Sequence, residues 1–357
     1  MSKGRVLSIQ SHVAFGYVGG KAAVFPLQCL GYDVDVVNTV NFSNHSGYRR
    51  FGGTRANAAE LSAIFQYMEG NGLLHPERLL TGYIPGGDAL SAVTDLARKL
   101  REHNPELIYL LDPVLGDSGK LYVSADVIPI YRSILPLSTI ITPNWFEVEV
   151  LTDVQLTDLP SLRRALKVLH TEYRVPNVVI SSIPLREWLK DSLPSDLRPP
   201  VGEDISDSDY LLSIVSSTHG NTTENAPSIV HARSVTCLPG YFSGVGDLFS
   251  ALVLGHYEHS KRASPEDNSI TAIADAVAQA LTKTHAMLSM THMHAANLPE
   301  DERQPTDEEL DSKEPDRVVR RMRGRELRLI QGQDIIRNVE RVEEHMGLWD
   351  SFWTESQ

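Results

Sequence analysis

The chain has 357 residues, of which 41% are hydrophobic, and its formal net charge is −13. A nucleic-acid surface needs clustered Lys and Arg, so this acidic balance argues against a nucleic-acid partner. The sequence has no apolar run of the roughly 18 residues that a membrane-spanning helix needs, which argues against a membrane partner. It has two cysteines and begins without a signal peptide, so we expect a cytoplasmic protein, with nuclear access left open.

The length is sufficient for one large hydrophobic core, and no clear boundary divides the chain, so we expect a single domain over residues 1–357. Short apolar runs alternate with helical periodicity along the first half. The runs predict strands at 6–10, 33–37, 79–83, 107–111, 139–142 and 177–181, and helices at 19–30, 56–68, 90–101, 146–151 and 162–173. This alternation predicts an α/β fold with a mostly parallel central sheet and helices on both faces.

Two segments have the composition of insertions. Residues 190–209 are rich in Pro, Ser and Asp and are predicted to form a surface loop. Residues 298–317 contain nine acidic and three basic residues with three prolines, which predicts a disordered acidic linker. Beyond it, residues 326–330 alternate like an edge strand, and the aromatic tail at 348–353 is predicted to pack against the body or a second subunit.

A glycine-rich turn at 242–247, Phe-Ser-Gly-Val-Gly-Asp, precedes an apolar run with the length of a buried helix. The first turn of a helix carries unpaired backbone N–H groups, and glycines let a phosphate approach them. Asp247 beside such a site is either a general base for a hydroxyl about to be phosphorylated or a helix cap. The turn is no dinucleotide fingerprint, because Phe249 occupies the third glycine position, and residues 16–22 do not fit a P-loop.

Polar residues follow several of the predicted strands. They occupy positions 10–12, 81–83, 112–113, 142–144 and 181–182. In a parallel sheet the carboxyl ends of the strands meet at one edge, where ligands bind. The sequence therefore predicts one site that draws on all of these segments.

Six blocks carry a more specific signal when they are read together: LSIQSHV at 7–13, GYVG at 16–19, NFSNHSGY at 41–48, DPVLGD at 112–117, ITPNWFE at 141–147 and GVGD at 244–247. In order and spacing, over roughly residues 4–292, they resemble the pyridoxal kinases of the ribokinase-like superfamily. The resemblance implies a ribokinase-like fold, a homodimer and a role in vitamin B6 salvage. The implied reaction is ATP-dependent phosphorylation of the 5'-hydroxymethyl group of pyridoxal, and also of pyridoxine and pyridoxamine.

The resemblance also implies roles for individual residues. Asp247 matches the catalytic base, and the amides of Gly244, Val245 and Gly246 match those that hold the transferring phosphoryl group. The positions that match contacts to the vitamer are Ser11, Val18, Phe42, His45, Ser46 and Tyr83, together with Asp247. Those that match ATP contacts are Asp112, Tyr122 in a lid, Asn144, Ser181, Ser182, Gly244 and Gly246. Those that match the binding of Mg²⁺ (or Zn²⁺) and K⁺ are Asp112, Asp117, Thr142 and Glu147.

The residues alone leave other interpretations open. His45 has the alternative of a core or turn histidine, Asp112 that of a turn former, and Glu147 that of a carboxylate in the first turn of a helix. Two other functions also fit in part: a hydroxymethylpyrimidine kinase and a non-catalytic pyridoxal phosphate binding protein. Ser11 and the block 44–48 favour pyridoxal as the substrate. Asp247 with both glycines disfavours mere storage, because storage needs no base.

Overall fold

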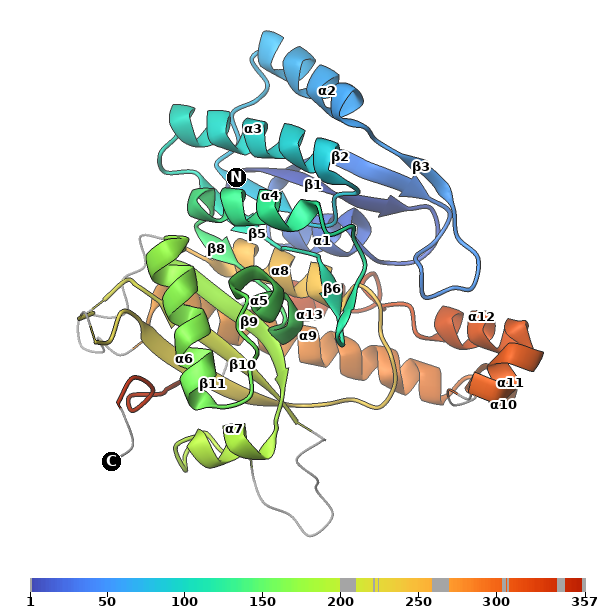
Figure 1. The fold of residues 1–357 in the computed structure, drawn as a ribbon. Coiled ribbons are helices and arrows are strands. Elements are labelled where there is room, and N and C mark those ends of the chain that lie inside the picture. The colour runs from blue at the N-terminus through green and yellow to red at the C-terminus, as the bar shows by residue number, and fades with distance from the viewer. Residues whose placement is uncertain are drawn as a thin grey trace.

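A ten-stranded sheet forms the centre of the molecule (Figure 1), in the order β12-β11-β10-β9-β8-β5-β4-β1-β2-β3. The computed structural model describes residues 2–199, 210–220, 222–223, 225–258, 270–303, 306, 308–338 and 344–354. The six neighbours from β9 to β2 pair in parallel, and antiparallel strands extend the sheet on both sides. The predicted mostly parallel sheet is confirmed.

The strands and helices predicted along the first half of the chain are present, and β3, the β6–β7 hairpin and α4 occur in addition to them. The strands are β1 (Arg5–Val13), β2 (Asp33–Phe42), β3 (Gly53–Arg55), β4 (Arg78–Thr81), β5 (Ile108–Leu111), β8 (Ile140–Ile141), β9 (Asn177–Pro184), β10 (Tyr210–Ser217), β11 (Ile229–Thr236) and β12 (Gly347–Leu348), with a separate hairpin of β6 (Gly116–Asp117) and β7 (Lys120–Leu121). The α-helices are α1 (Gly20–Cys29), α2 (Ala58–Gly70), α3 (Gly87–His103), α4 (Val127–Ile134), α5 (Trp145–Thr152), α6 (Leu159–Lys167), α7 (Glu187–Ser192), α8 (Val245–His256), α9 (Ala272–Ala296), α10 (Glu300–Arg303), α11 (Glu308–Lys313), α12 (Pro315–Gly324) and α13 (Gln333–Arg337).

The two faces of the sheet bury different helices, because successive strand residues point to opposite sides. Leu79 packs with α2, α3, α4, α5 and α6 in one core cluster, and the adjacent Leu80 packs with α1, α8 and α9 in another. Tyr109 and Leu110, which are adjacent on β5, likewise belong to the first and the second core cluster. The two groups of helices lie on opposite sides of the sheet in Figure 1. Helices on both faces leave the carboxyl ends of the parallel strands as the natural place for a site.

The C-terminal side of the sheet was not predicted from the sequence. Strands β10 and β11 pair antiparallel along their whole lengths, and β10 also pairs antiparallel with β9. The last strand, β12, pairs with His231 and Ala232 at the edge of β11. The aromatic tail does pack on the body, since Trp349 and Phe352 are buried in the first core cluster.

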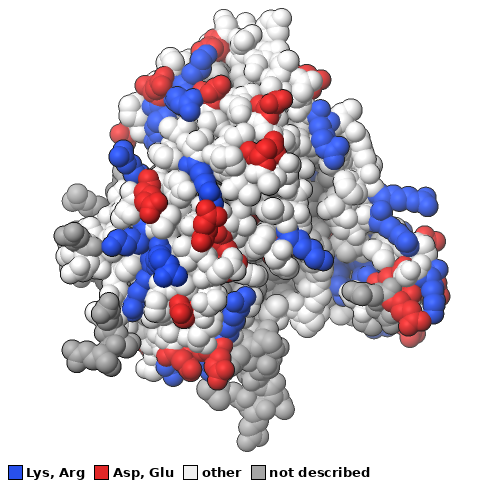
Figure 2. Space-filling view, viewed as in Figure 1, with Lys and Arg blue, Asp and Glu red and all other residues white. Residues whose placement is uncertain are grey.

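The acidic segment 298–317 differs from the predicted disordered linker, because its described residues include α10, α11 and the start of α12. Asp311 accepts hydrogen bonds from Arg321 at 3.1 and 2.7 Å and from Arg317 at 3.3 Å, and the two arginines are buried. The pairing of Asp311 with two arginines therefore holds a segment whose excess of acidic residues would by itself favour disorder. Figure 2 shows acidic and basic side chains gathered together over these helices, and intermixed elsewhere on that face.

Two further segments differ from their predicted form. Residues 326–330 are not an edge strand: Leu327 and Leu329 are buried as the alternation indicated, but the backbone turns without a strand partner. Within 190–209, residues up to Ser192 belong to α7 and Leu193 is buried, while 200–209 lie outside the described residues. In the part of the chain that the structure describes, no helix combines the length and apolar character needed to cross a bilayer.

Candidate active site

The predicted site residues come together in one cavity of about 780 Å³. It lies where the carboxyl ends of the parallel strands meet the N-terminus of α8. The predicted residues that line it are Ser11, Val18, Phe42, His45, Ser46, Tyr83, Asp112, Asp117, Tyr122, Thr142, Asn144, Glu147, Ser181, Ser182, Gly244, Val245, Gly246 and Asp247. Segments more than 200 residues apart in the sequence thus contribute to a single site.

Residues 244–247, hereafter the anion turn, form the first turn of α8. Gly244 is the N-cap residue and has φ of 79°. A Cβ added at Gly244 would overlap the carbonyl oxygen of Tyr17, whereas one at Gly246 would meet nothing within 4 Å. The first glycine is therefore required by the chain's own backbone, and the second leaves space open for a ligand. The amides of Val245 and Gly246 belong to the first turn, where N–H groups have no partner within the helix.

Asp247 does not cap the helix, since Gly244 occupies the N-cap position. Its Oδ2 atom accepts a hydrogen bond of 2.8 Å from the amide of Gly19, which follows β1. The carboxyl group therefore lies at the carboxyl end of an early strand, inside the cavity. Burial raises the pKa of Asp247 above its ordinary value, and the hydrogen bond from Gly19 offsets part of the rise. A carboxylate with a raised pKa is a stronger base, which suits proton removal from a hydroxyl.

Asp112 lies at the end of β5 and is buried. Ser250, on α8, donates a hydrogen bond of 3.0 Å to its Oδ2 atom, and Thr142 lies 2.8 Å from the same serine hydroxyl. Burial and the charge of Asp247 raise the pKa of Asp112 to about 7, against the effect of the serine. Ser250 was missed at the sequence level, although it stands one helical turn after Asp247.

Glu147 has the geometry of a first-turn helix carboxylate. It forms a capping box with Asn144, and its two oxygens accept hydrogen bonds from the amides of Leu115 at 2.9 Å and Asn144 at 2.9 Å, with Gly116 at 3.4 Å. Burial and the charge of Asp112 raise the pKa of Glu147 well above its ordinary value. Among the described residues, no group of three His, Cys, Asp or Glu side chains could hold a metal ion by itself.

Asp117 and Tyr122, the latter predicted to belong to a lid, lie on and directly after the hairpin of β6 and β7. Asp117 Oδ1 accepts a hydrogen bond of 2.6 Å from the amide of Ser118, which occupies the left-handed region with φ of 50°. Tyr122 directly follows the hairpin and is 57% exposed while it lines the cavity. A side chain in this position has room to move over a ligand.

The wall predicted to face the vitamer combines rings and polar groups. The ring of Phe42 lies 5.7 Å from that of Phe51, and the guanidinium of Arg55 lies 5.1 Å from the Phe42 ring. Phe51 and Arg55 also line the cavity but were not selected from the sequence. His45 is 7% exposed, so it is both a buried histidine and a lining residue.

A second part of the cavity was also missed at the sequence level. It lies along α9, where Leu281, Thr284, His285 and Leu288 line the cavity. The hydroxyl of Thr284 and the Nε2 atom of His285 are buried without a hydrogen-bond partner among the described residues. Buried polar atoms of this kind require a partner, so a ligand with donors and acceptors fits there. No sequence pattern indicated this part of the cavity, because nothing in the residues of α9 links that helix to the early strands.

Comparison with known proteins places this geometry in a family. The chain is 40% identical over 253 residues to pyridoxal kinase of Arabidopsis thaliana, which is 71% of this chain and 74% of that protein. The chain belongs to the pyridoxal kinase family. Over 258 residues it is 39% identical to the pyridoxal kinase of Homo sapiens, with 70% of this chain and 76% of that protein covered. The resemblance read from the six blocks is confirmed.

Solved structures agree with membership in the pyridoxal kinase family. Pyridoxal kinase from Leishmania donovani in complex with ADP superimposes with a TM-score of 0.74 at 29% identity, covering 96% of this chain and 99% of that one. A family model described as phosphomethylpyrimidine kinase matches residues 74–196. That match covers the middle of the sheet, whereas the likeness to pyridoxal kinases extends over most of the chain.

Proposed function

We propose that this chain is an ATP-dependent kinase that phosphorylates the 5'-hydroxymethyl group of pyridoxal, and also of pyridoxine and pyridoxamine. The observation that carries the proposal is the place of Asp247, a half-buried carboxyl group that lines the cavity beside the amides of the anion turn. Relatives named pyridoxal kinase support this substrate class. The structure of the Leishmania donovani enzyme in complex with ADP and pyridoxine supports both ligands.

The proposed reaction has one proton transfer and one phosphoryl transfer. Asp247 takes the proton from the hydroxymethyl group, and the resulting oxygen attacks the γ-phosphorus of ATP. The bond between the γ-phosphorus and the bridging oxygen of the β-phosphate breaks, and ADP leaves. The amides of the anion turn hold the charge that spreads over the γ-phosphoryl oxygens in the transition state. Tyr122 and the β6–β7 hairpin form the lid that excludes water, which would otherwise hydrolyse ATP.

We propose that cations bind near the buried carboxylates Asp112, at the end of β5, and Glu147, in the first turn of α5. Mg²⁺ keeps several waters and takes one or two carboxylates together with phosphate oxygens, so it needs no cage of protein ligands. Asp112 fits a direct ligand, because one of its oxygens is free of the bond from Ser250. Glu147 fits an indirect role, because backbone amides occupy its oxygens. The divalent ion, Mg²⁺ or Zn²⁺, would neutralise the phosphate charge when bound, with K⁺ near Thr142 and Asp117 on the lid side.

The base of the nucleotide is proposed to lie along α9. The unpartnered atoms of Thr284 and His285 supply a hydroxyl and a ring nitrogen for hydrogen bonds to it. Asn144, Ser181 and Ser182 then lie along the path of the phosphates. We further propose that residues 1–357 act as one domain and that the active protein is a homodimer, which sedimentation equilibrium tests by giving twice the chain mass.

An assay of ADP release tests the activity, with pyridoxal, pyridoxine, pyridoxamine and hydroxymethylpyrimidine as acceptors. We expect the highest kcat/KM with a B6 vitamer. A higher value with hydroxymethylpyrimidine would assign the chain to that substrate instead. No ADP release with any acceptor, together with tight binding of pyridoxal phosphate, would indicate a binding protein. The same assay with a chelator, with Mg²⁺ or Zn²⁺ restored, and with K⁺ replaced by Na⁺ tests the cations.

A further inference from the structure

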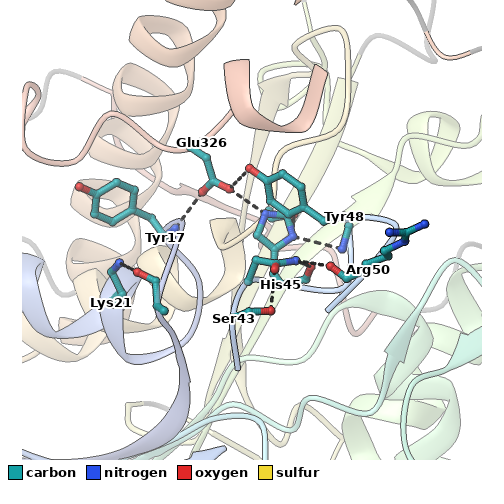
Figure 3. Close-up of polar contacts among 11 residues, drawn as sticks. Tyr17, Lys21, Ser43, His45, Tyr48, Arg50 and Glu326 are labelled. Carbon is teal, nitrogen blue, oxygen red and sulfur yellow. Dashed lines mark hydrogen bonds and ion pairs between the residues drawn. The ribbon is translucent and has the colours of Figure 1, made fainter. Parts of the chain in front are cut away.

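Glu326 is a charged residue directly behind the lining residue His45, and neither the sequence motifs nor the reaction steps include it. It lies in the turn after α12, and its side chain is 12% exposed. Three donors converge on its carboxylate (Figure 3): the amide of Tyr17 at 2.8 Å, Nε2 of His45 at 2.9 Å and the hydroxyl of Tyr48 at 2.8 Å. The donors come from two loops near the N-terminus, so one side chain joins the C-terminal segment to both.

The hydrogen bonds around His45 define its tautomer. The amide of Gly47 points at Nδ1 at 3.1 Å, and because a backbone N–H only donates, Nδ1 is an acceptor. The proton of the neutral ring is therefore on Nε2, from where it is donated to Glu326. The hydroxyl of Ser243 lies 3.3 Å from the same Nδ1 atom. Ser243 immediately precedes the anion turn, so the oriented imidazole contacts the segment that leads into the phosphate site.

The bond to Tyr17 acts on the second loop, residues 14–19. The carbonyl oxygen of Tyr17 lies against Gly244, where a Cβ would overlap it, and the amide of Gly19 donates to Asp247. A Cβ on Gly16 would also meet the Glu326 carboxylate, at 2.7 Å. This loop therefore fits closely between Glu326 on one side and the anion turn on the other.

The Glu326 carboxylate is ionised, as three converging donors require. Burial by itself raises its pKa, but the hydrogen bonds from His45, the Tyr17 amide and Tyr48 outweigh burial and hold the pKa of Glu326 below its ordinary value. His45 and Tyr48 donate to Oε1, and Tyr17 donates to Oε2. An ionised carboxylate accepts on both oxygens and donates from neither, whereas an amide accepts on one and donates from the other.

We propose that Glu326 is a positioning residue for the vitamer side of the site, holding His45 as the Nε2–H tautomer and fixing the loop that contacts Asp247. The proposal rests on the proposed kinase activity and names a determinant of vitamer binding outside the motifs. Glu326 reaches the vitamer through His45 and the loop at 14–19. Removal of the Glu326 carboxylate therefore lowers kcat/KM for the vitamer more than it affects KM for ATP.

The variant Glu326→Gln tests the proposal, with Glu314→Gln as its control. The glutamine keeps the length of the side chain but sets an N–H group against one of the three donors. Glu314 is an exposed glutamate at the start of α12, whose side chain makes no capping bond. We expect Glu326→Gln to lower kcat/KM for pyridoxal by about 10-fold or more, with KM for ATP within about two-fold of wild type. We expect Glu314→Gln to match wild type in both.

Several outcomes would overturn the proposal. They are an unchanged kcat/KM for pyridoxal, or an equal loss toward pyridoxal and ATP that follows the loss of thermal stability. If Glu326→Gln does not fold, Tyr48→Phe removes one of the three donors and keeps the ring, and it should lower kcat/KM for pyridoxal in the same selective way. A selective ¹⁵N label on His45 should report protonated Nε2 in wild type; protonated Nδ1 would contradict the assignment. A wild-type chain without activity on any vitamer would refute the proposed function instead, and the label would still test the tautomer.

Discussion

The two glycines of the anion turn have opposite roles in the structure, and alanine at each should separate folding from phosphate binding. Alanine at Gly244 must adopt the left-handed conformation, which costs about 1–2 kcal/mol, and its Cβ overlaps the backbone oxygen of Tyr17. We expect Gly244→Ala to lower the free energy of unfolding by about 2 kcal/mol or more. Alanine at Gly246 meets open space in the first turn of α8, so we expect no loss of stability there.

The space in front of Gly246 is where the phosphate must approach the amides. We therefore expect Gly246→Ala to reduce kcat/KM for ATP by about 10²-fold, the loss typical of one oxyanion donor, at undiminished stability. Urea unfolding and the ADP-release assay measure the two effects. Gly70→Ala is a control, because Gly70 is exposed at the end of α2 with nothing within 4 Å of its added Cβ. Wild-type stability of Gly244→Ala, or wild-type kinetics of Gly246→Ala, would refute this interpretation of the turn.

Three more substitutions give separate tests. Asp247→Asn keeps an acceptor for the Gly19 amide but cannot take a proton, so kcat should fall by about 10²–10⁴-fold in the same assay; an unimpaired rate would remove Asp247 from the mechanism. Burial lowers the pKa of His170 to about 4. Between pH 4 and 6.5 the unfolded chain therefore binds more protons at His170 than the folded chain does. The contribution of His170 to the free energy of unfolding is thus fully present above pH 6.5 and is lost as the pH falls toward 4. His170→Gln should remove about 3 kcal/mol of that pH dependence in urea unfolding at pH 7 and pH 4, whereas an equal slope in both proteins would exclude His170 as its source. Asp311→Asn breaks the paired contact with Arg321. We expect amide hydrogen exchange in α12 to become at least about 10-fold faster, while exchange in β4 stays unchanged. Unchanged exchange in α12 would show that the pair does not order the insertion.

The parallel half of the fold was predictable because its rules are local. An apolar run such as 107–111, followed by a polar residue such as Asp112, identifies both a buried strand and its functional end. The anion turn was equally visible, since glycine spacing and the following apolar helix lie within one short segment. Asp112 and the anion turn do line one cavity.

What escaped prediction depends on partners that are distant in the sequence. Strands β10 and β11 are antiparallel, and nothing in their own residues identifies β9 as the neighbour of β10 or β12 as the neighbour of β11. The alternation at 326–330 made Glu326 look like one position of an edge strand, and its role was missed because its donors lie in loops near the N-terminus. For Glu147 the resemblance implied a metal site and the residue pattern left a first-turn helix carboxylate open; the bond from the Asn144 amide fits the second interpretation, but the bond from the distant Leu115 amide could not be predicted from the sequence.

The pairing of β12 with β11 has a consequence for biosynthesis. β11 emerges from the ribosome long before residues 347 and 348, so during translation its outer backbone groups have no neighbour. The amide of Trp349 then bonds to the carbonyl of Val230 at 2.8 Å, and the following aromatic rings seal the adjacent core. A nascent or prematurely terminated chain that lacks the last dozen residues therefore exposes the unpaired edge of β11 and part of the apolar core. Both are features that chaperones bind.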